Sequence, residues 1–146
     1  MKKFLFRMET LLKVRTAREG GLKRNLEHTT QKWNQIKERE KMLLAQISAL
    51  MDEMHTKRQE GKLDLQETYT QILDHLNSSL IQVQQSLMAQ ERQMEEHKEQ
   101  LKQGILERKV IEKIKEKHYA GWRTQQVKIE GALLDEISYQ KSADSN

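Results

Sequence analysis

Apolar residues recur with a seven-residue period through the first part of this chain. Two series of positions, one counted from Leu5 and the other from Met8, run to Lys57, and eleven of their sixteen members are apolar. A repeat of this kind, sustained over many heptads, is typical of a coiled coil rather than of one face of a globular helix. Proline, which breaks helix interiors, is absent from the 146 residues. The sequence therefore predicts long helices.

The heptad repeat is interrupted once, between His55 and Lys62, where no large apolar residue occurs and Gly61 is suited to a helix end. It resumes in a ladder that starts at Leu73, and after Leu101 the apolar positions shift out of the strict heptad. We predict a single coiled-coil domain over residues 1–146. Its expected parts are helix 1 at about 4–57, a turn at about 58–63, helix 2 at about 64–139 and a disordered tail over 140–146.

The two predicted helices match each other when the second folds back along the first. Pairs whose numbers add up to about 122 place Leu22 opposite Leu101 and Leu12 opposite Val110, so that apolar residues meet. The predicted fold class is therefore all-α, a long antiparallel two-helix coiled coil or helical hairpin. Helix 2 is the longer helix, and its overrun leaves four apolar residues without an intramolecular partner: Trp122, Ile129, Leu133 and Ile137.

Several function classes are excluded by composition. Cysteine is absent, which removes thiol catalysis and Cys-ligated metal sites, and the five histidines never occur at the i, i+4 spacing of a helical metal site. No phosphate-binding glycine loop occurs, and a thin two-helix coil offers no pocket that excludes water. We expect no enzyme activity, no catalytic or metal-binding residue, no cofactor and no small-molecule substrate. The Phe4–Phe6 apolar run is too short for an export signal, and we expect a cytoplasmic protein.

Charge is distributed unevenly along the chain. Residues 1–41 contain 12 basic and 5 acidic residues, whereas residues 42–100 contain 5 and 10. Residues 101–128 are again basic, and an antiparallel hairpin brings both basic segments to the same end. Such an end could bind nucleic acid, acidic lipid or an acidic protein surface. The aromatic residues are too dispersed for a nucleic-acid site, so no nucleic-acid partner is expected.

The opening of the chain resembles a known family. The residues that carry the resemblance are Lys3-Phe4-x-Phe6-x-Met8-Glu9-x-Leu11-Leu12-x-x-Arg15-x-x-x-Glu19, which are similar to the start of FliJ, a small coiled-coil component of the flagellar type III export apparatus. The similarity continues through Tyr69-x-x-x-Leu73-x-x-Leu76 and Gln82-x-x-x-x-Leu87, and returns in residues 107–116 and in Leu134-Asp135-Glu136.

The resemblance implies both a fold and a role in the flagellum. FliJ proteins form a long antiparallel two-helix coiled coil similar to the γ stalk of rotary ATPases, and they take part in flagellar protein export, and hence in flagellum biogenesis and motility. Their terminal end acts as the stalk of the hexameric export ATPase. Their body contacts the membrane export gate and export chaperones. The expected location is the cytoplasm, peripheral to the inner face of the cell membrane.

The resemblance and the charge pattern together assign partner-binding residues. The residues expected to contact the ATPase ring are Phe4, Phe6, Leu11, Arg15, Arg18, Lys109, Lys113 and Trp122. The residues expected to contact the export gate are Tyr69, Ile72 and Leu76. An alternative stays open, in which the chain is a structural coiled-coil adaptor or a self-associating scaffold unrelated to the export ATPase.

Overall fold

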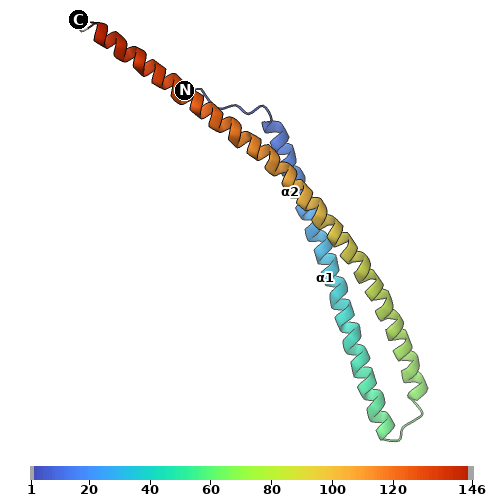
Figure 1. The fold of residues 1–146 in the computed structure, drawn as a ribbon. Coiled ribbons are helices and arrows are strands. Elements are labelled where there is room, and N and C mark those ends of the chain that lie inside the picture. Colours follow the sequence, from blue (N-terminus) through green and yellow to red (C-terminus); the bar gives the residue numbers. More distant parts are fainter. Residues whose placement is uncertain (1, 145–146) are drawn as a thin grey trace. The chain divides into compact units, whose positions relative to one another are not determined.

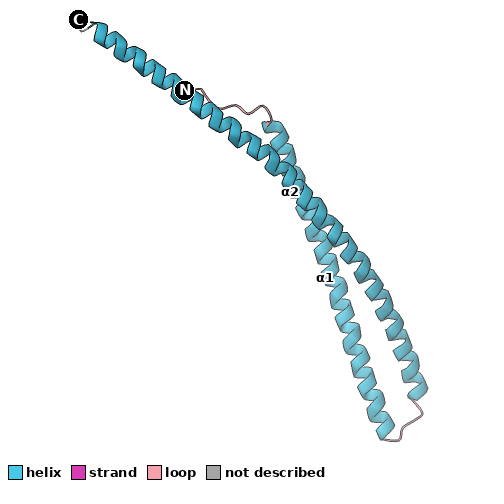
Figure 2. Ribbon diagram, in the orientation of Figure 1, coloured by secondary structure: helices cyan, strands magenta, loops and turns pink. Residues whose placement is uncertain are grey.

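Two long helices make up almost all of the chain in the computed structural model, which describes residues 2–144 (Figures 1 and 2). They are α1 (Glu9–Gln59) and α2 (Gln66–Asp144), and no strand occurs within the described range. Side-chain contacts between them are antiparallel in order, since Arg15 bonds to Glu107 whereas Glu53 bonds to Tyr69. The two numbers of each pair add up to 122. The predicted all-α antiparallel two-helix coiled coil is confirmed.

The segment 2–8, which we call the strap, is not helical, and α1 begins at Glu9 rather than near residue 4 as predicted. Phe4 and Phe6 both pack against aromatic side chains of α2. Residues two apart lie on nearly opposite sides of a helix but on the same side of an extended chain. The extended strap therefore lets both phenylalanine rings reach α2, which a helix would prevent.

The turn occupies the loop 60–65 and lies two residues beyond the predicted 58–63. Gly61 has a φ of 73°, a left-handed conformation that glycine adopts without the steric cost of a side chain. Its N–H donates to the carbonyl of Arg58, and the N–H of Lys62 donates to the carbonyl of Lys57. These two bonds form a Schellman motif, which satisfies the last carbonyls of α1 and ends the helix.

Helix α2 begins at Gln66, just after the predicted start, and continues to Asp144. The prediction of a tail from residue 140 was therefore wrong over 140–144, while residues 145 and 146 lie outside the described residues. No proline or glycine follows Gly131, so nothing in the sequence ends the helix earlier.

Contacts divide the described chain into two compact units, although a single one was predicted. The terminal unit contains the residues up to Gly20 together with those from Lys102 onward, and the turn unit contains Gly21–Leu101. The division falls between two adjacent glycines of α1, which have no side chains to extend contacts along the helix. Each unit has its own segment of α1 and its own segment of α2.

The turn unit has a narrow apolar core. Tyr69, Val83 and Leu87 of α2 are buried, with at most 9% of their surface exposed. They pack beside half-buried members of the predicted heptad series on α1, including Ile36, Leu43, Ile47 and Leu50. In Figure 1 these segments of α1 and α2 lie side by side and are joined by the loop. The apolar seam is the source of stability that the heptad predicts.

A polar layer interrupts this apolar seam. Thr29 is 3% exposed, and its hydroxyl oxygen lies 2.8 Å from the carbonyl oxygen of Asn25 and 2.6 Å from Nδ1 of His97. The side-chain amide of Gln90 donates to the backbone carbonyl of Thr29 at 3.3 Å. Gln90 and His97, which continue the seven-residue spacing of Val83, are therefore both hydrogen-bonded to one buried residue of α1.

In the terminal unit, polar residues take over the heptad positions. Arg108, Lys115 and Trp122 continue at seven-residue spacing along α2, and all three are half-buried. Val110, which was predicted to face Leu12, is 57% exposed. Val110 therefore lies outside the seam, and the half-buried Arg108 and Ile111 occupy the inward positions on either side of it. The heptad here continues through charged residues instead.

Candidate functional site

An aromatic cluster fixes the strap to α2 in the terminal unit. The Phe4 ring lies 5.3 Å from the ring of Tyr119 and 5.8 Å from that of Trp122, measured between centroids. The Phe6 ring lies 5.8 Å from the ring of His118, edge to face. The Lys115 ammonium lies 6.0 Å from the Phe6 centroid, within the range of a cation–π contact. The cluster covers α2 as far as Trp122.

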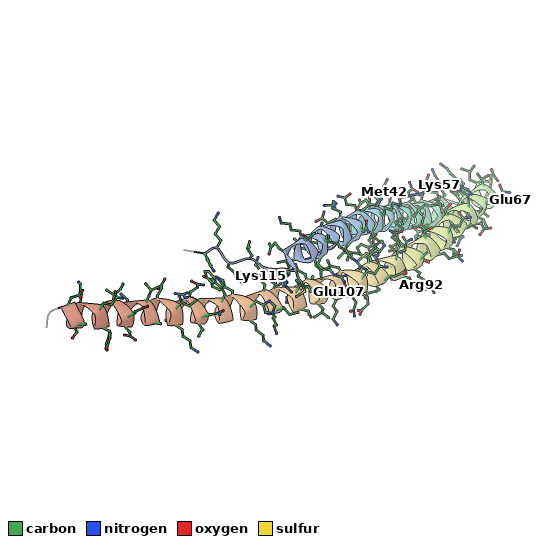
Figure 3. The ribbon with its side chains drawn as sticks, turned by 90° about the horizontal axis from the view of Figure 1, so that it is seen from above. Met42, Lys57, Glu67, Arg92, Glu107 and Lys115 are labelled. Carbon is green, nitrogen blue, oxygen red and sulfur yellow. The ribbon has the colours of Figure 1, made fainter. Side chains whose placement is uncertain are left out.

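Ion pairs form the seam next to this cluster. Glu107 accepts a hydrogen bond from Arg15 at 2.7 Å, and Arg18 lies 3.6 Å from the same carboxylate. Lys115 is paired with Glu9 at 2.8 Å. Figure 3 labels Glu107 and Lys115 on the part of α2 beside which α1 begins. These pairs join the start of α1 to α2 beside half-buried apolar residues such as Leu12 and Ile111.

The innermost ion pair joins Arg108 to Glu19. The Glu19 side chain is 9% exposed and accepts a hydrogen bond from Arg108, whose guanidinium also donates to Glu112 at 2.7 Å. These two hydrogen bonds raise the pKa of Arg108 above its ordinary value, so the residue stays charged. A buried carboxylate needs such a partner, because an unpaired charge in this position would be costly.

The structure brings some of the predicted ring-binding residues together but turns several of them inward. Phe6 is buried, and Phe4 and Trp122 are half-buried in the aromatic cluster. Arg15 is largely engaged with Glu107. The predicted residues that remain accessible to a partner are Leu11, Arg18, Lys109 and Lys113.

Beyond the aromatic cluster, α2 has no other described segment beside it in the terminal unit (Figure 1). Ile129, Leu133 and Ile137 are between 46% and 54% exposed, as the predicted overrun requires. Trp122 departs from the prediction of an exposed stripe because Phe4 packs on it. The uncovered apolar surface therefore starts after Trp122.

The predicted gate-binding residues lie in the turn unit and differ in accessibility. Tyr69 is buried, and its hydroxyl donates to Glu53 at 3.1 Å. Burial, followed by that hydrogen bond, raises the pKa of Tyr69 above its ordinary value. Leu76 is half-buried in the seam, whereas Ile72 is 44% exposed. Ile72 is the member of this set that offers apolar surface to a partner.

An open groove runs between α1 and α2 in the turn unit. Its floor contains the seam residues Leu43 and Val83, and small serine side chains lie along one wall. Ile72 and Ser79 are seven residues apart, so they lie on the same side of α2. The lining residues are Arg39, Met42, Leu43, Gln46, Ser79, Gln82, Val83 and Ser86.

Sequence reasoning missed the outward-facing residue of the strap. Leu5 was counted as a member of the heptad seam, but it is 87% exposed. Phe4, Leu5 and Phe6 are all apolar, so no alternation of apolar and polar residues marks this segment as extended. The local sequence therefore contains no signal that would have turned the phenylalanines inward and the leucine outward.

No group of His, Asp or Glu side chains suited to holding a metal ion occurs within residues 2–144. Within the same range, no helix is long and apolar enough to span a bilayer.

Comparison with known proteins identifies the family. The family model described as Flagellar FliJ protein matches residues 3–146. The chain belongs to the FliJ family. No curated protein and no solved structure matches the chain. Membership makes it a component related to flagellar protein export, in a family whose members are non-catalytic and are associated with the export apparatus.

Proposed function

We propose that the terminal unit of this FliJ-family chain acts as the stalk of the hexameric flagellar export ATPase. In this proposal the chain also links the ATPase to the membrane export gate and to export chaperones, and so works at the inner face of the cell membrane. The observation that supports the ATPase contact is the set of accessible cations in the terminal unit. An acidic lining of the ATPase pore would attract such a surface.

The cations of the terminal unit fall into two groups. Arg15, Arg108 and Lys115 are committed to ion pairs within the unit. Lys109 and Lys113 are exposed on α2, four residues apart and hence on the same side of the helix. Arg18 is 58% exposed in its side chain and only loosely placed near Glu107. Lys109 and Lys113 can meet a partner without disturbing those three ion pairs, and Arg18 would give up only its longer contact with Glu107.

The test replaces accessible cations and leaves the ion-paired seam intact. Lys109→Glu with Lys113→Glu should slow association with the ATPase ring roughly tenfold at low salt and should reduce its stimulation of ATP hydrolysis. Lys32→Glu with Lys41→Glu changes the net charge equally at exposed positions of the turn unit and is the matched control. Surface plasmon resonance measures the association rate. Equal rates for the two variants would contradict the proposal.

The proposed gate contact rests on Ile72. This residue keeps 44% of its surface exposed beside a seam that Tyr69, Leu76 and Leu80 already form. Exposed apolar area that a fold does not need is a feature of partner-binding surfaces. The open groove continues along the same side of α2 and would give a partner segment a place to lie.

Ile72→Asp should weaken binding to the cytoplasmic part of the export gate while leaving helicity unchanged. Ile81→Asp is the control, because Ile81 lies in the same helix and is 55% exposed. Pull-down with the gate protein and circular dichroism provide the two measurements. Wild-type gate binding by the Ile72 variant would remove this surface from the proposal.

Sedimentation velocity separates the proposal from a self-associating scaffold. A scaffold that pairs through the exposed end of α2 should form dimers whose population rises with concentration, and Leu133→Asp should abolish them. A stalk should stay monomeric until the ATPase is added.

A further inference from the structure

The strap presents two different faces. Phe6 is buried and Phe4 is half-buried against α2, whereas Leu5 between them is 87% exposed. Lys3 and Arg7, which flank the apolar residues of the strap, are also exposed, and Arg7 lies in the turn that leads into α1. Alternate side chains of an extended segment point to opposite sides. Lys3 and Leu5 therefore share the side opposite the phenylalanines, and together with the exposed Arg7 they form what we call the outward face.

Neither packing nor ion pairing within the described residues accounts for the side chains of the outward face. A leucine is normally among the most buried residue types, and Leu5 is the most exposed large apolar side chain of the described chain. Among the described residues, no carboxylate is paired with Lys3 or Arg7, and the strap itself contains no acidic residue. Its charge is therefore available to a partner.

The chemistry of this face defines what would recognise it. A single leucine between two cations fits an apolar pocket with carboxylates at its rim. The aromatic cluster already holds the strap against α2, so the face is ordered before a partner arrives and little entropy is lost on binding. Lys109 and Lys113 extend the basic surface within the same unit.

We infer that Leu5, flanked by Lys3 and Arg7, is the strap's contact with an acidic-rimmed apolar pocket of the export ATPase, and that Phe4 and Phe6 hold the strap in place. This inference rests on the function proposed above. It reverses the roles expected from the sequence, in which the phenylalanines contact the ring and Leu5 lies in the seam. An anionic membrane surface is less well matched, because the two aromatic side chains that could anchor the strap in lipid are turned inward.

Cysteine accessibility tests the two faces of the strap directly. The chain has no cysteine, so Leu5→Cys and Phe6→Cys each introduce a unique thiol. A maleimide reagent should label the Leu5→Cys variant at least tenfold faster than the Phe6→Cys variant. The contacts of Phe4 with Tyr119 and Trp122 still hold the strap on α2 in the Phe6→Cys variant, so equal labelling rates would overturn the inference.

Partner binding is tested with Leu5→Ser in the full chain and the assembled ATPase ring. Because Leu5 would be buried in the pocket of the ring, its loss should weaken binding roughly ten- to a hundredfold, and helicity should not change. Leu63→Ser is the control, since Leu63 is 63% exposed in the loop of the turn unit. Lys3→Gln with Arg7→Gln should reduce the salt dependence of binding.

The outcomes separate the inference from the proposed function. If the wild-type chain binds the ring and the Leu5→Ser variant binds equally well, the inference fails and the proposed function stands. If the wild-type chain does not bind the ring, both fail. Binding to phosphatidylglycerol vesicles that depends on Leu5, together with unchanged ring binding, would also overturn the inference in favour of a membrane contact.

Discussion

The two units of this chain use one seven-residue repeat in two chemically different ways. In the turn unit the seam is mostly aliphatic, with Val83 and Leu87 buried at its centre. In the terminal unit Arg15, Glu19 and Arg108 occupy heptad positions and bond to carboxylates or cations of the opposite segment. Apolar contacts are not directional, whereas ion pairs depend on geometry, salt and the protonation of both partners. A regular heptad therefore does not imply a uniform source of stability.

The largest difference should appear when one buried apolar side chain is truncated. Leu87→Ala should lower the free energy of unfolding by about 3 kcal/mol, because Leu87 is 7% exposed and its removal leaves a cavity. Ile111→Ala, at a half-buried seam position of the terminal unit, should cost about 1 kcal/mol. Urea unfolding followed by circular dichroism measures both. Equal losses would mean that the terminal unit has an apolar core after all.

The next effect concerns the inner ion pair. Arg108→Met removes the Arg108–Glu19 ion pair and should increase amide exchange around residue 108 roughly tenfold, while exchange around Leu87 stays unchanged. Adding Glu19→Leu to this variant should restore protection, since both charges are then gone. Hydrogen exchange with mass spectrometry resolves the two segments. If amide exchange in the double variant were as fast as in the single variant, the ion pair would have a role other than balancing the two charges.

Salt should act on the two units in opposite directions. Raising the ionic strength from about 0.05 M to about 1 M shortens the screening length to about 3 Å. Amide exchange over residues 105–115 should accelerate a few-fold, whereas exchange over 76–87 should stay constant or slow. Sulfate, which strengthens apolar burial, should enlarge the contrast. If salt changed the amide exchange rates of both units in the same direction, the two units would depend on the same type of interaction for stability.

The smallest effect is a pH dependence in the turn unit. The pKa of Tyr69 is raised in the fold by burial and by Glu53. Its contribution to stability is therefore complete below the pKa of an exposed tyrosine, about 10, and is lost as the pH rises through the raised pKa. Tyr69→Phe should be slightly less stable than the wild type at pH 8 and should lose less stability by pH 11. Tyr139→Phe, at a 78% exposed position, should follow the wild type at both pH values.

Much of the fold follows from local features of the sequence. Every member of the two heptad series from Met8 to Lys57 is buried or half-buried. Gly61 forms the helix-ending motif that a glycine just after a helix predicts. The ionic seam could not be predicted in the same way. Whether Arg108 is a surface cation or the partner of Glu19 depends on the register between segments some ninety residues apart.

The sequence assigns the candidate site to one end of the hairpin, but it does not predict the orientation of the side chains there. The basic charge of residues 1–41 and 101–128 indicates which end of the hairpin attracts an acidic partner. The inward rotation of Phe4 and Phe6 depends on Tyr119 and His118 lying opposite them, which no local pattern reveals. Ile72 lies outside the heptad positions of Tyr69 and Leu76, so its exposure follows from the heptad alone.

The polar layer around Thr29 has a mechanical consequence for the turn unit. If the two helices were sheared by one heptad, aliphatic residues would still meet aliphatic residues along most of the seam. Gln90 and His97 would lose their bonds to Thr29 at the same moment, and each buried polar group without a partner costs about 1–3 kcal/mol. A lengthwise load is therefore resisted at discrete places, this layer and the Tyr69–Glu53 hydrogen bond among them, rather than evenly along the coil. The helices therefore keep their register until the load is large enough to break these hydrogen bonds together, and they do not slide by small steps below that load.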